Sequence, residues 1–380
     1  MQTSVKHSLL AVIGIALLSL PLHAEILYAA NADASSVSAY HIAGNGALKP
    51  IVGSTIPSGT WPVSIAVDLF GRFLFTANMG DDTISAYRIR PNGSLTHLSD
   101  SKTGSMPESL AIDPFGRFLY VTNLDGEGIP GHGGTVGHVS AYHIAIDGTL
   151  TPVFGSPFAA GFSPLTVKTD PLGRFVYVGN AGSQEENTET VSGYRVGGNG
   201  ALIPLPNSPF RDGESPQSLA VDPFGRFLYT AGEYDLALLT YRIAGNGNLT
   251  NLPGSSFRAG NGFEPWNAVA ADPFGRFIYT SSGPENNPAN ATFSVYRVGA
   301  NGLTFGSSYP AGFVADSMVA DFTGQFFYAA MNIVKGASQP VDGNGIAAYR
   351  IMGNSTLIQV PGSPFEVGFS PDSMAICPFP

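Results

Sequence analysis

Four potential metal ligands lie close together in one glycine-rich segment. Asp125, Glu127, His132 and His138 fall within fourteen residues. Carboxylate oxygens and imidazole nitrogens form a workable ligand set for zinc or a similar metal. The spacing matches no metal-binding motif, so a solvated loop without a metal is the alternative. Apart from this possible divalent cation, we expect no cofactor.

Polar residues also recur at one fixed place in a sequence repeat, five positions before its marker residue or the equivalent of that residue. They are Glu108, Gln217, Asn267, Asp316 and Asp372. If the repeats surround an axis, these side chains form a polar ring at the entrance of a central channel. Such a ring could bind a cation or a polar ligand, and ordinary solvation of the entrance is the alternative.

The marker is a turn of the type Asp113-Pro-Phe-Gly-Arg-Phe118. It begins at Asp68, Asp113, Asp170, Asp222 and Asp272, and in degraded form at Asp321. The aspartate can accept hydrogen bonds from the backbone that follows, and glycine supplies the left-handed conformation of the turn. A catalytic pair is needed once, so a carboxylate in nearly every repeat indicates turn capping rather than catalysis.

The repeat is about fifty residues long, which indicates an array architecture. Each unit contains runs rich in β-branched and aromatic residues, bounded by turn-forming residues, and reads as four short strands. No long segment after the N-terminus has the 3.6-residue apolar period of a helix. The sequence therefore predicts an all-β chain.

Two motif counts predict how the array closes. The aspartate turn occurs six times, whereas the Tyr-x-Ile/Val strand occurs seven times, starting with Tyr40. The strand missing before the first copy reappears at the end of the chain, where Ser373–Cys377 matches Ser109–Asp113. We therefore predict a seven-bladed β-propeller with four antiparallel strands per blade, its first blade closed by the C-terminal strand. Residues 25–380 form this single domain.

Residues 1–24 have the pattern of a secretory signal peptide. Lys6 precedes an apolar run from Leu9 to Leu20, and Ala24 provides a small residue at the cleavage site. This pattern predicts a periplasmic or secreted protein without a membrane span after signal removal. Cys377 is the only cysteine and is expected to be a buried filler of the closing strand.

The net charge restricts the kinds of partner that the protein can bind. The net charge is −10, and charged residues make up only 12% of the chain. Nucleic acid is therefore an unsuitable partner. We expect a monomer that binds an unknown protein or a small polar ligand.

The segment Asp113-Pro-Phe-Gly-Arg-Phe-Leu-Tyr-Val-Thr-Asn123 resembles the Tyr-Val-Thr-Asn repeat of seven-bladed propellers in the lactonase superfamily. That superfamily includes propeller-type 6-phosphogluconolactonases and carboxymuconate cyclases, and the resemblance covers residues 25–380. It implies a lactonase active site made of His, Arg and Glu on successive blades. Glu233 matches this signature, whereas Gln217 and Ser218 stand where the enzymes have an Arg-His pair. The neighbouring repeats also lack the expected histidines, in Pro164–Lys168 and Trp266–Ala270.

Two functional classes therefore remain open. The first is an exported 6-phosphogluconolactonase-like propeller that acts as a binding scaffold through its channel entrance and its longer loops. The second is a lactone hydrolase with a diverged active site and Glu233 as its catalytic carboxylate. The longer loops connect the second and third strands of the repeats, at Leu124–Gly137, Ala181–Thr190, Gly232–Ala237, Ser281–Thr292 and Ala329–Gly345.

Overall fold

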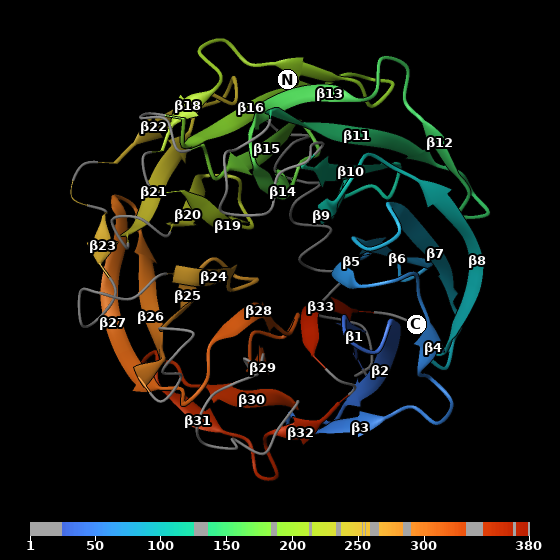
Figure 1. Ribbon diagram of the computed structural model, residues 1–380. Coiled ribbons are helices and arrows are strands. Elements are labelled where there is room, and N and C mark those ends of the chain that lie inside the picture. Colours follow the sequence, from blue (N-terminus) through green and yellow to red (C-terminus); the bar gives the residue numbers. More distant parts are fainter. Residues whose placement is uncertain are drawn as a thin grey trace, which may run out of the picture.

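The computed structural model describes residues 25–378 except 125–135, 184–187, 213–214, 233–236, 253, 255, 259–265, 284–289, 332–344 and 368–369. In this part of the chain, seven antiparallel sheets are arranged around a common axis (Figure 1). The prediction of an all-β, seven-bladed propeller is confirmed.

The first three blades follow one plan, with the inner strand given first. Blade 1 contains β33 (Pro371–Cys377), β1 (Ile26–Asn31), β2 (Ser36–Ile42), β3 (Leu48–Pro50) and β4 (Ile56–Pro57). Blade 2 contains β5 (Pro62–Val67), β6 (Phe73–Asn78), β7 (Thr83–Ile89) and β8 (Leu95–Lys102). Blade 3 contains β9 (Pro107–Ile112), β10 (Phe118–Asn123), β11 (Val136–Ile144), β12 (Leu150–Pro152) and β13 (Phe158–Phe162).

The remaining four blades repeat this order. Blade 4 contains β14 (Pro164–Thr169), β15 (Phe175–Asn180), β16 (Thr190–Val196), β17 (Leu202–Pro204) and β18 (Phe210–Arg211). Blade 5 contains β19 (Pro216–Val221), β20 (Phe227–Gly232), β21 (Ala237–Ile243), β22 (Leu249–Asn251) and β23 (Phe257–Arg258). Blade 6 contains β24 (Trp266–Ala271), β25 (Phe277–Ser282), β26 (Thr292–Gly299) and β27 (Gly302–Pro310). Blade 7 contains β28 (Ala315–Ala320), β29 (Phe326–Met331), β30 (Gly345–Ile351), β31 (Leu357–Gln359) and β32 (Phe365–Glu366).

The second strand of each blade lies in the core. All six residues of these strands are buried, because neighbouring blades cover both faces of each sheet. A continuous apolar run is the sequence pattern of such a strand. Several of these strands carry a fully buried tyrosine whose hydroxyl needs a partner. Tyr28 donates to the Gly93 carbonyl oxygen at 2.8 Å, and Tyr328 donates to that of Gly46 at 3.0 Å, each in the next blade.

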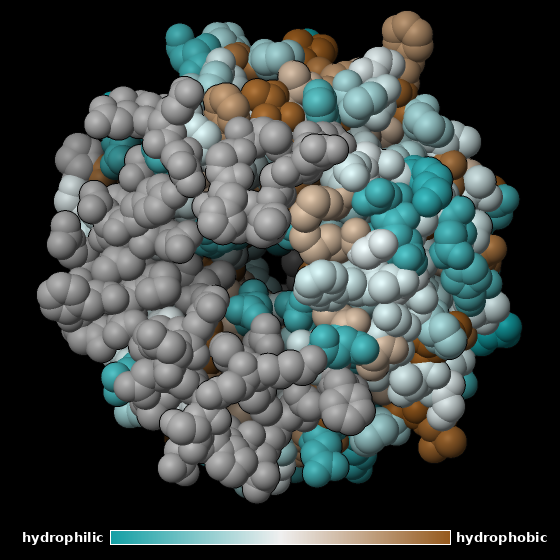
Figure 2. Space-filling view, in the orientation of Figure 1, coloured by the Kyte–Doolittle hydropathy of each residue, from teal (hydrophilic) through white to brown (hydrophobic). Residues whose placement is uncertain are grey.

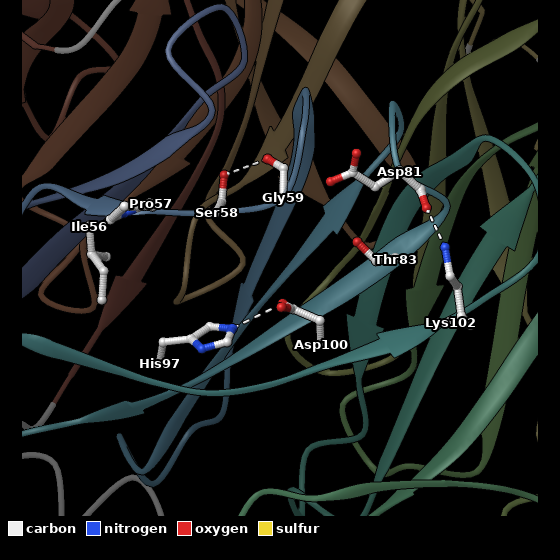
Figure 3. Close-up of a pocket in the computed structure, with 9 residues that line it drawn as sticks. All are labelled: Ile56, Pro57, Ser58, Gly59, Asp81, Thr83, His97, Asp100 and Lys102. Atoms are coloured by element: carbon white, nitrogen blue, oxygen red, sulfur yellow. Dashed lines mark hydrogen bonds and ion pairs between the residues drawn. The ribbon is translucent and has the colours of Figure 1, made fainter.

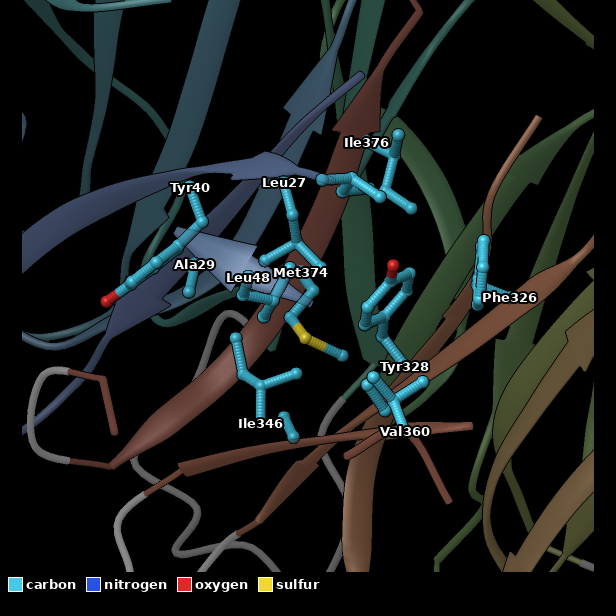
Figure 4. Close-up of a cluster of buried hydrophobic side chains, with 13 residues drawn as sticks. Leu27, Ala29, Tyr40, Leu48, Phe326, Tyr328, Ile346, Val360, Met374 and Ile376 are labelled. Atoms are coloured by element: carbon cyan, nitrogen blue, oxygen red, sulfur yellow. The ribbon is translucent and has the colours of Figure 1, made fainter. Parts of the chain in front are cut away.

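The C-terminal strand closes the ring. β33 pairs with β1 from Ile26 opposite Cys377 to Asn31 opposite Pro371. Leu27, Met374 and Ile376 from blade 1 pack against Tyr328 from blade 7 (Figure 4). Cys377 is buried and free, as predicted. The two ends of the chain therefore share one blade and one part of the core.

The repeated aspartates cap their turns. Asp68 Oδ1 accepts hydrogen bonds from the amides of Arg72 and Phe73 at 2.6 and 2.9 Å, and Asp68 Oδ2 accepts from Arg72 Nε at 2.6 Å. Arg72 also donates to the Gly116 carbonyl oxygen in the turn of the next blade, at 3.2 Å. The predicted capping role is confirmed, and the arginine additionally joins neighbouring blades.

A second set of bonds joins the inner strands around the axis. The serine four positions before the marker accepts a hydrogen bond from an amide of the next inner strand. The pairs are Ser64 with Leu110, Ser109 with Val167, Ser218 with Val269, Ser317 with Met374, and Ser373 with Ile65. These bonds hold the wall of the channel in register.

Candidate functional site

The predicted polar ring lies at β-bulges. In β9, Pro107 pairs with Asn123 and Ser109 pairs with Thr122, so Glu108 between them has no partner residue in the ladder. The same shift isolates Gln217 in β19, Asn267 in β24 and Asp372 in β33, and a wider one isolates Asp316 in β28. A bulge re-aims its side chain, which explains why this position can be polar inside an apolar strand. Val63 and Leu165 occupy it in the other two blades.

The ring is acidic along one arc. Burial, and then the Asp372 carboxylate, raise the pKa of Glu108 to about 7. Burial, and then Asp316 and Asp33, raise the pKa of Asp372 to about 7, although Ser370 donates to Asp372 Oδ1 at 3.4 Å. Each carboxyl can therefore be neutral or charged near neutral pH. Carboxyl groups with shifted pKa values at the entrance of a channel are candidates for ligand recognition.

The space-filling view shows a hollow at the centre of the ring of blades (Figure 2). Hydrophilic residues line part of its rim. The seven inner strands surround this axis in the order of the blades (Figure 1). Glu108 from blade 3 and Asp372 from blade 1 lie on either side of blade 2, where Val63 adds an apolar segment. We call these bulge positions the channel mouth.

The other predicted site residues fall mostly outside the described part of the chain. Asp125, Glu127, His132 and the catalytic candidate Glu233 all do so. His138 is described and lies in β11, half-buried, opposite Asn123 of β10. Among the described residues, no group of three or more His, Cys, Asp or Glu side chains can hold a metal ion. The metal hypothesis and the role of Glu233 therefore stay predictions.

Ser218 has a structural role. The lactonase resemblance places a histidine at or beside this position, but the Ser218 hydroxyl accepts the Val269 amide hydrogen bond at 3.2 Å and so joins β19 to β24. Its neighbour Gln217 occupies a mouth position and is half-buried. Neither side chain carries a charge, so this blade supplies no cation at the place where the enzymes carry one.

The sequence did not predict a second polar cavity, on the outer side of the ring. It has a volume of about 720 Å³ and lies between β4 of blade 1 and β8 of blade 2 (Figure 3). His97 Nε2 lies 3.0 Å from Asp100 Oδ1, and Lys102 Nζ donates to the Asp81 carbonyl oxygen at 3.1 Å. His97 is 42% exposed and Asp100 is 51% exposed, so this pair is solvated and contributes little energy.

The sequence signal for this cavity is an altered outer strand. Blades 1, 3, 4, 5 and 7 divide their outer edge into two short strands, whereas β8 runs without a break from Leu95 to Lys102. The segment that interrupts the edge in those five blades is absent from β8, and it is also absent from β27 of blade 6. Asp100 and Lys102 therefore remain uncovered beside blade 1.

Comparisons with known proteins agree with this architecture. A family model described as lactonase, seven-bladed β-propeller, matches residues 18–103 and 91–187. Residues 18–187 of the chain are therefore similar to this lactonase family. The solved structure of a putative 6-phosphogluconolactonase from Bacteroides uniformis is 16% identical, with a TM-score of 0.75, over 93% of this chain and 99% of that chain. A search of curated protein sequences finds no significant match.

A second solved structure gives the cellular setting of one protein with the same fold. The periplasmic gluconolactonase of Pseudomonas aeruginosa is 18% identical, with a TM-score of 0.73, over 94% of this chain and 99% of that chain. Identities this low establish the shared fold. In the described part of this chain, no helix has the length and hydrophobicity needed to cross a membrane.

Proposed function

We propose that this lactonase-family propeller is an exported binding protein that holds a small polar ligand, or a polar segment of a protein, at its channel mouth. The observation that carries the proposal is the pair Glu108 and Asp372, whose pKa values are both raised to about 7. A neutral carboxyl donates one hydrogen bond and accepts others, whereas a carboxylate only accepts. Two such groups can therefore match the hydroxyl groups of a small ligand.

A ligand at the mouth would also contact uncharged groups. Gln217 occupies the equivalent position in blade 5, and Val63 provides an apolar contact in blade 2. Binding sites commonly combine apolar walls with a few well-placed polar groups. The mouth has this composition, and its backbone is fixed by the serine bonds between inner strands.

The second candidate function is lactone hydrolysis. The observation that favours it is the shared fold with the two named lactonases. Hydrolysis requires a positioned acid or base and stabilisation of the negative charge on the carbonyl oxygen. Glu233 would supply the first, and Gln217 and Ser218 replace the cationic pair that would supply the second. We therefore favour ligand binding over hydrolysis.

The binding proposal is tested with a panel of neutral sugars, polyols and sugar lactones against the purified mature protein. Isothermal titration at about pH 6 should detect binding, which the double variant Glu108→Gln with Asp372→Asn should weaken by at least about tenfold, or 1.4 kcal/mol. Glu366→Gln is the matched control, because it removes one exposed carboxylate from the outer strand β32. Equal binding by the double variant and the control would reject the channel mouth as the site.

The export part of the proposal rests on residues 1–24, which lie outside the described residues. If this segment is a signal peptide, a bacterial host should release a protein whose N-terminal residue is Glu25. N-terminal sequencing of the periplasmic or secreted fraction measures this directly. Recovery of the uncleaved chain from the cytoplasm alone would contradict export.

A further inference from the structure

One inner strand carries a lysine inside the channel wall. Lys168 is the fifth residue of β14 and stands two positions before the turn aspartate Asp170. The other blades have a small aliphatic residue at this place, namely Ala66, Ala111, Ala220, Ala270, Val319 and Ala375. Among the inner-strand residues that follow the bulges, Lys168 is the only charged side chain.

Lys168 can reach solvent through the central channel. β14 lies between the inner strands β9 and β19, and β15 covers its outer edge. Lys168 is nevertheless partly exposed, whereas Ala111 and Ala220 in the neighbouring blades are buried. Because β14 is an inner strand, we infer that the amine gains this exposure by extending along the channel.

The amine has no counter-charge there. Among the described residues, Lys168 takes part in no ion pair and no hydrogen bond of its side chain. The nearest carboxylate in sequence, Asp170, is paired with Arg174 at 2.9 Å. Burial lowers the pKa of Lys168, with no charged neighbour to raise it again. An unpaired ammonium in such surroundings is costly, so the neutral amine is favoured.

The titratable groups around β14 are few. β9 carries Glu108 at the mouth, three residues before Ala111, the counterpart of Lys168, which is an offset of about 10 Å along the strand. β10 and β15 carry Tyr120 and Tyr177, whose buried hydroxyls donate to the carbonyl oxygens of Gly200 and Gly247. β19 carries no titratable side chain, and β11 approaches β14 at its first residue, Pro164.

We propose that Lys168 is a reactive amine that captures a small aldehyde entering the channel. The nitrogen lone pair of the neutral amine attacks the carbonyl carbon, and the carbonyl oxygen takes up a proton to give a carbinolamine. Loss of one water molecule then forms a C=N bond, so that aldehyde and amine become an imine and water. No oxidant or reductant takes part. Buried lysines with a depressed pKa are suited to this chemistry.

The test compares lysines within one protein. The mature protein is incubated with propanal and sodium cyanoborohydride, which reduces any imine to a stable propyl-lysine, at a series of pH values. Peptide mass spectrometry then gives a labelling rate for Lys168 and for two lysines outside the channel, Lys49 and Lys102. At about pH 7, Lys168 should be labelled at least about tenfold faster than either, because each unit of pKa depression increases the neutral fraction tenfold. The difference should shrink at about pH 10.

Two outcomes would overturn the proposal. If Lys168 is labelled no faster than Lys49 and Lys102 at neutral pH, it is not a selectively reactive amine. If it is labelled at no pH, the channel does not admit an aldehyde to it. Lys168→Met should remove this label, leave the rates at the other two lysines unchanged and preserve the folded state by circular dichroism. Lys102→Met is the matched control and should leave the Lys168 rate unchanged.

Discussion

The Ser373 hydroxyl accepts a hydrogen bond from the Ile65 amide at 3.2 Å. These residues are 308 positions apart in the sequence, and the bond joins the last strand of the chain to the inner strand of blade 2. The same type of bond joins Ser317 to Met374 on the other side of β33. The C-terminal strand is thus held by both neighbouring blades as well as by β1.

Removal of Ser373–Pro380 should therefore destabilise the whole ring. Met374, Ile376 and Cys377 are buried, and each large apolar side chain contributes about 1.5–3 kcal/mol on burial. We expect a loss of about 5 kcal/mol and association through the exposed edge of β1. Calorimetry and size-exclusion chromatography measure both effects. A truncated protein that melts at the temperature of the parent would contradict closure, and removal of the last two residues alone is the control.

A single methyl group should weaken the junction between blades 7 and 1. Gly46 has a φ of +86°, and a Cβ there would overlap the Phe326 ring of blade 7. Gly46→Ala combines this overlap with a strained backbone, so we expect a loss of roughly 1–3 kcal/mol. Gly44→Ala is the matched control, because a Cβ at Gly44 meets no atom within 4 Å. Equal stability of the two variants in urea unfolding would show that the junction is not tightly packed.

Stability should fall as the pH rises from about 5 to about 8. Burial, and then Asp321, raise the pKa of Glu25 to about 8, although Phe322 donates an amide hydrogen bond to Glu25 Oε2 at 3.4 Å. A carboxyl with a raised pKa binds its proton more tightly in the folded state. Its contribution is therefore complete below the unfolded pKa and is lost as the pH rises through the folded value. The raised pKa values of Glu108 and Asp372 likewise make stability fall as the pH rises to about 7.

Glu25→Gln should make this pH profile flatter. The variant should melt at a higher temperature than the parent at about pH 8, and the gain should disappear at about pH 4. Glu366→Gln, on the exposed edge, is the control and should leave the slope unchanged. Differential scanning calorimetry across the pH range measures both. A parent protein that becomes more stable between about pH 5 and pH 8 would contradict the protonated state of Glu25.

The metal hypothesis makes a separate prediction. If Asp125, Glu127, His132 and His138 ligate zinc, added zinc should raise the melting temperature with a saturating dependence on concentration. The double variant His132→Ala with His138→Ala should abolish this shift, whereas His97→Ala in the outer cavity should preserve it. Elemental analysis of the purified protein provides a second measurement. Absence of bound metal together with no shift for any divalent ion would reject the site.

The repeat carries most of the information on the fold. The turn motif, whose first copy begins at Asp68, predicts both the turn and the buried strand that follows it. The two motif counts identify β33 as the closing strand. The mouth positions could also be read from the sequence, because they keep a constant distance from the marker. Their position at β-bulges could not, since a bulge depends on the pairing of two strands.

Features formed by contacts between blades could not be predicted from the sequence patterns. The contact of Glu25 with the Asp321 turn joins the first described residue to blade 7, and no local signal marks it. The outer cavity requires β4 and β8 to lie side by side. Alignment of the repeats on their marker shows that Lys168 replaces a small aliphatic residue, but its place in the wall of a channel depends on the arrangement of the seven inner strands.

The most direct test of the central claim is a hydrolysis assay of the mature protein on a panel of lactones that includes 6-phosphogluconolactone and glucono-1,5-lactone. We predict a rate equal to the uncatalysed background, the same for the parent and for Glu233→Gln. A lone carboxylate provides no cationic stabilisation of the oxyanion. The transition state for hydrolysis then lacks several kcal/mol of stabilisation, which corresponds to about a hundredfold or more in rate. Rapid hydrolysis of any lactone that Glu233→Gln abolishes would contradict the binding proposal and establish this propeller as a lactonase.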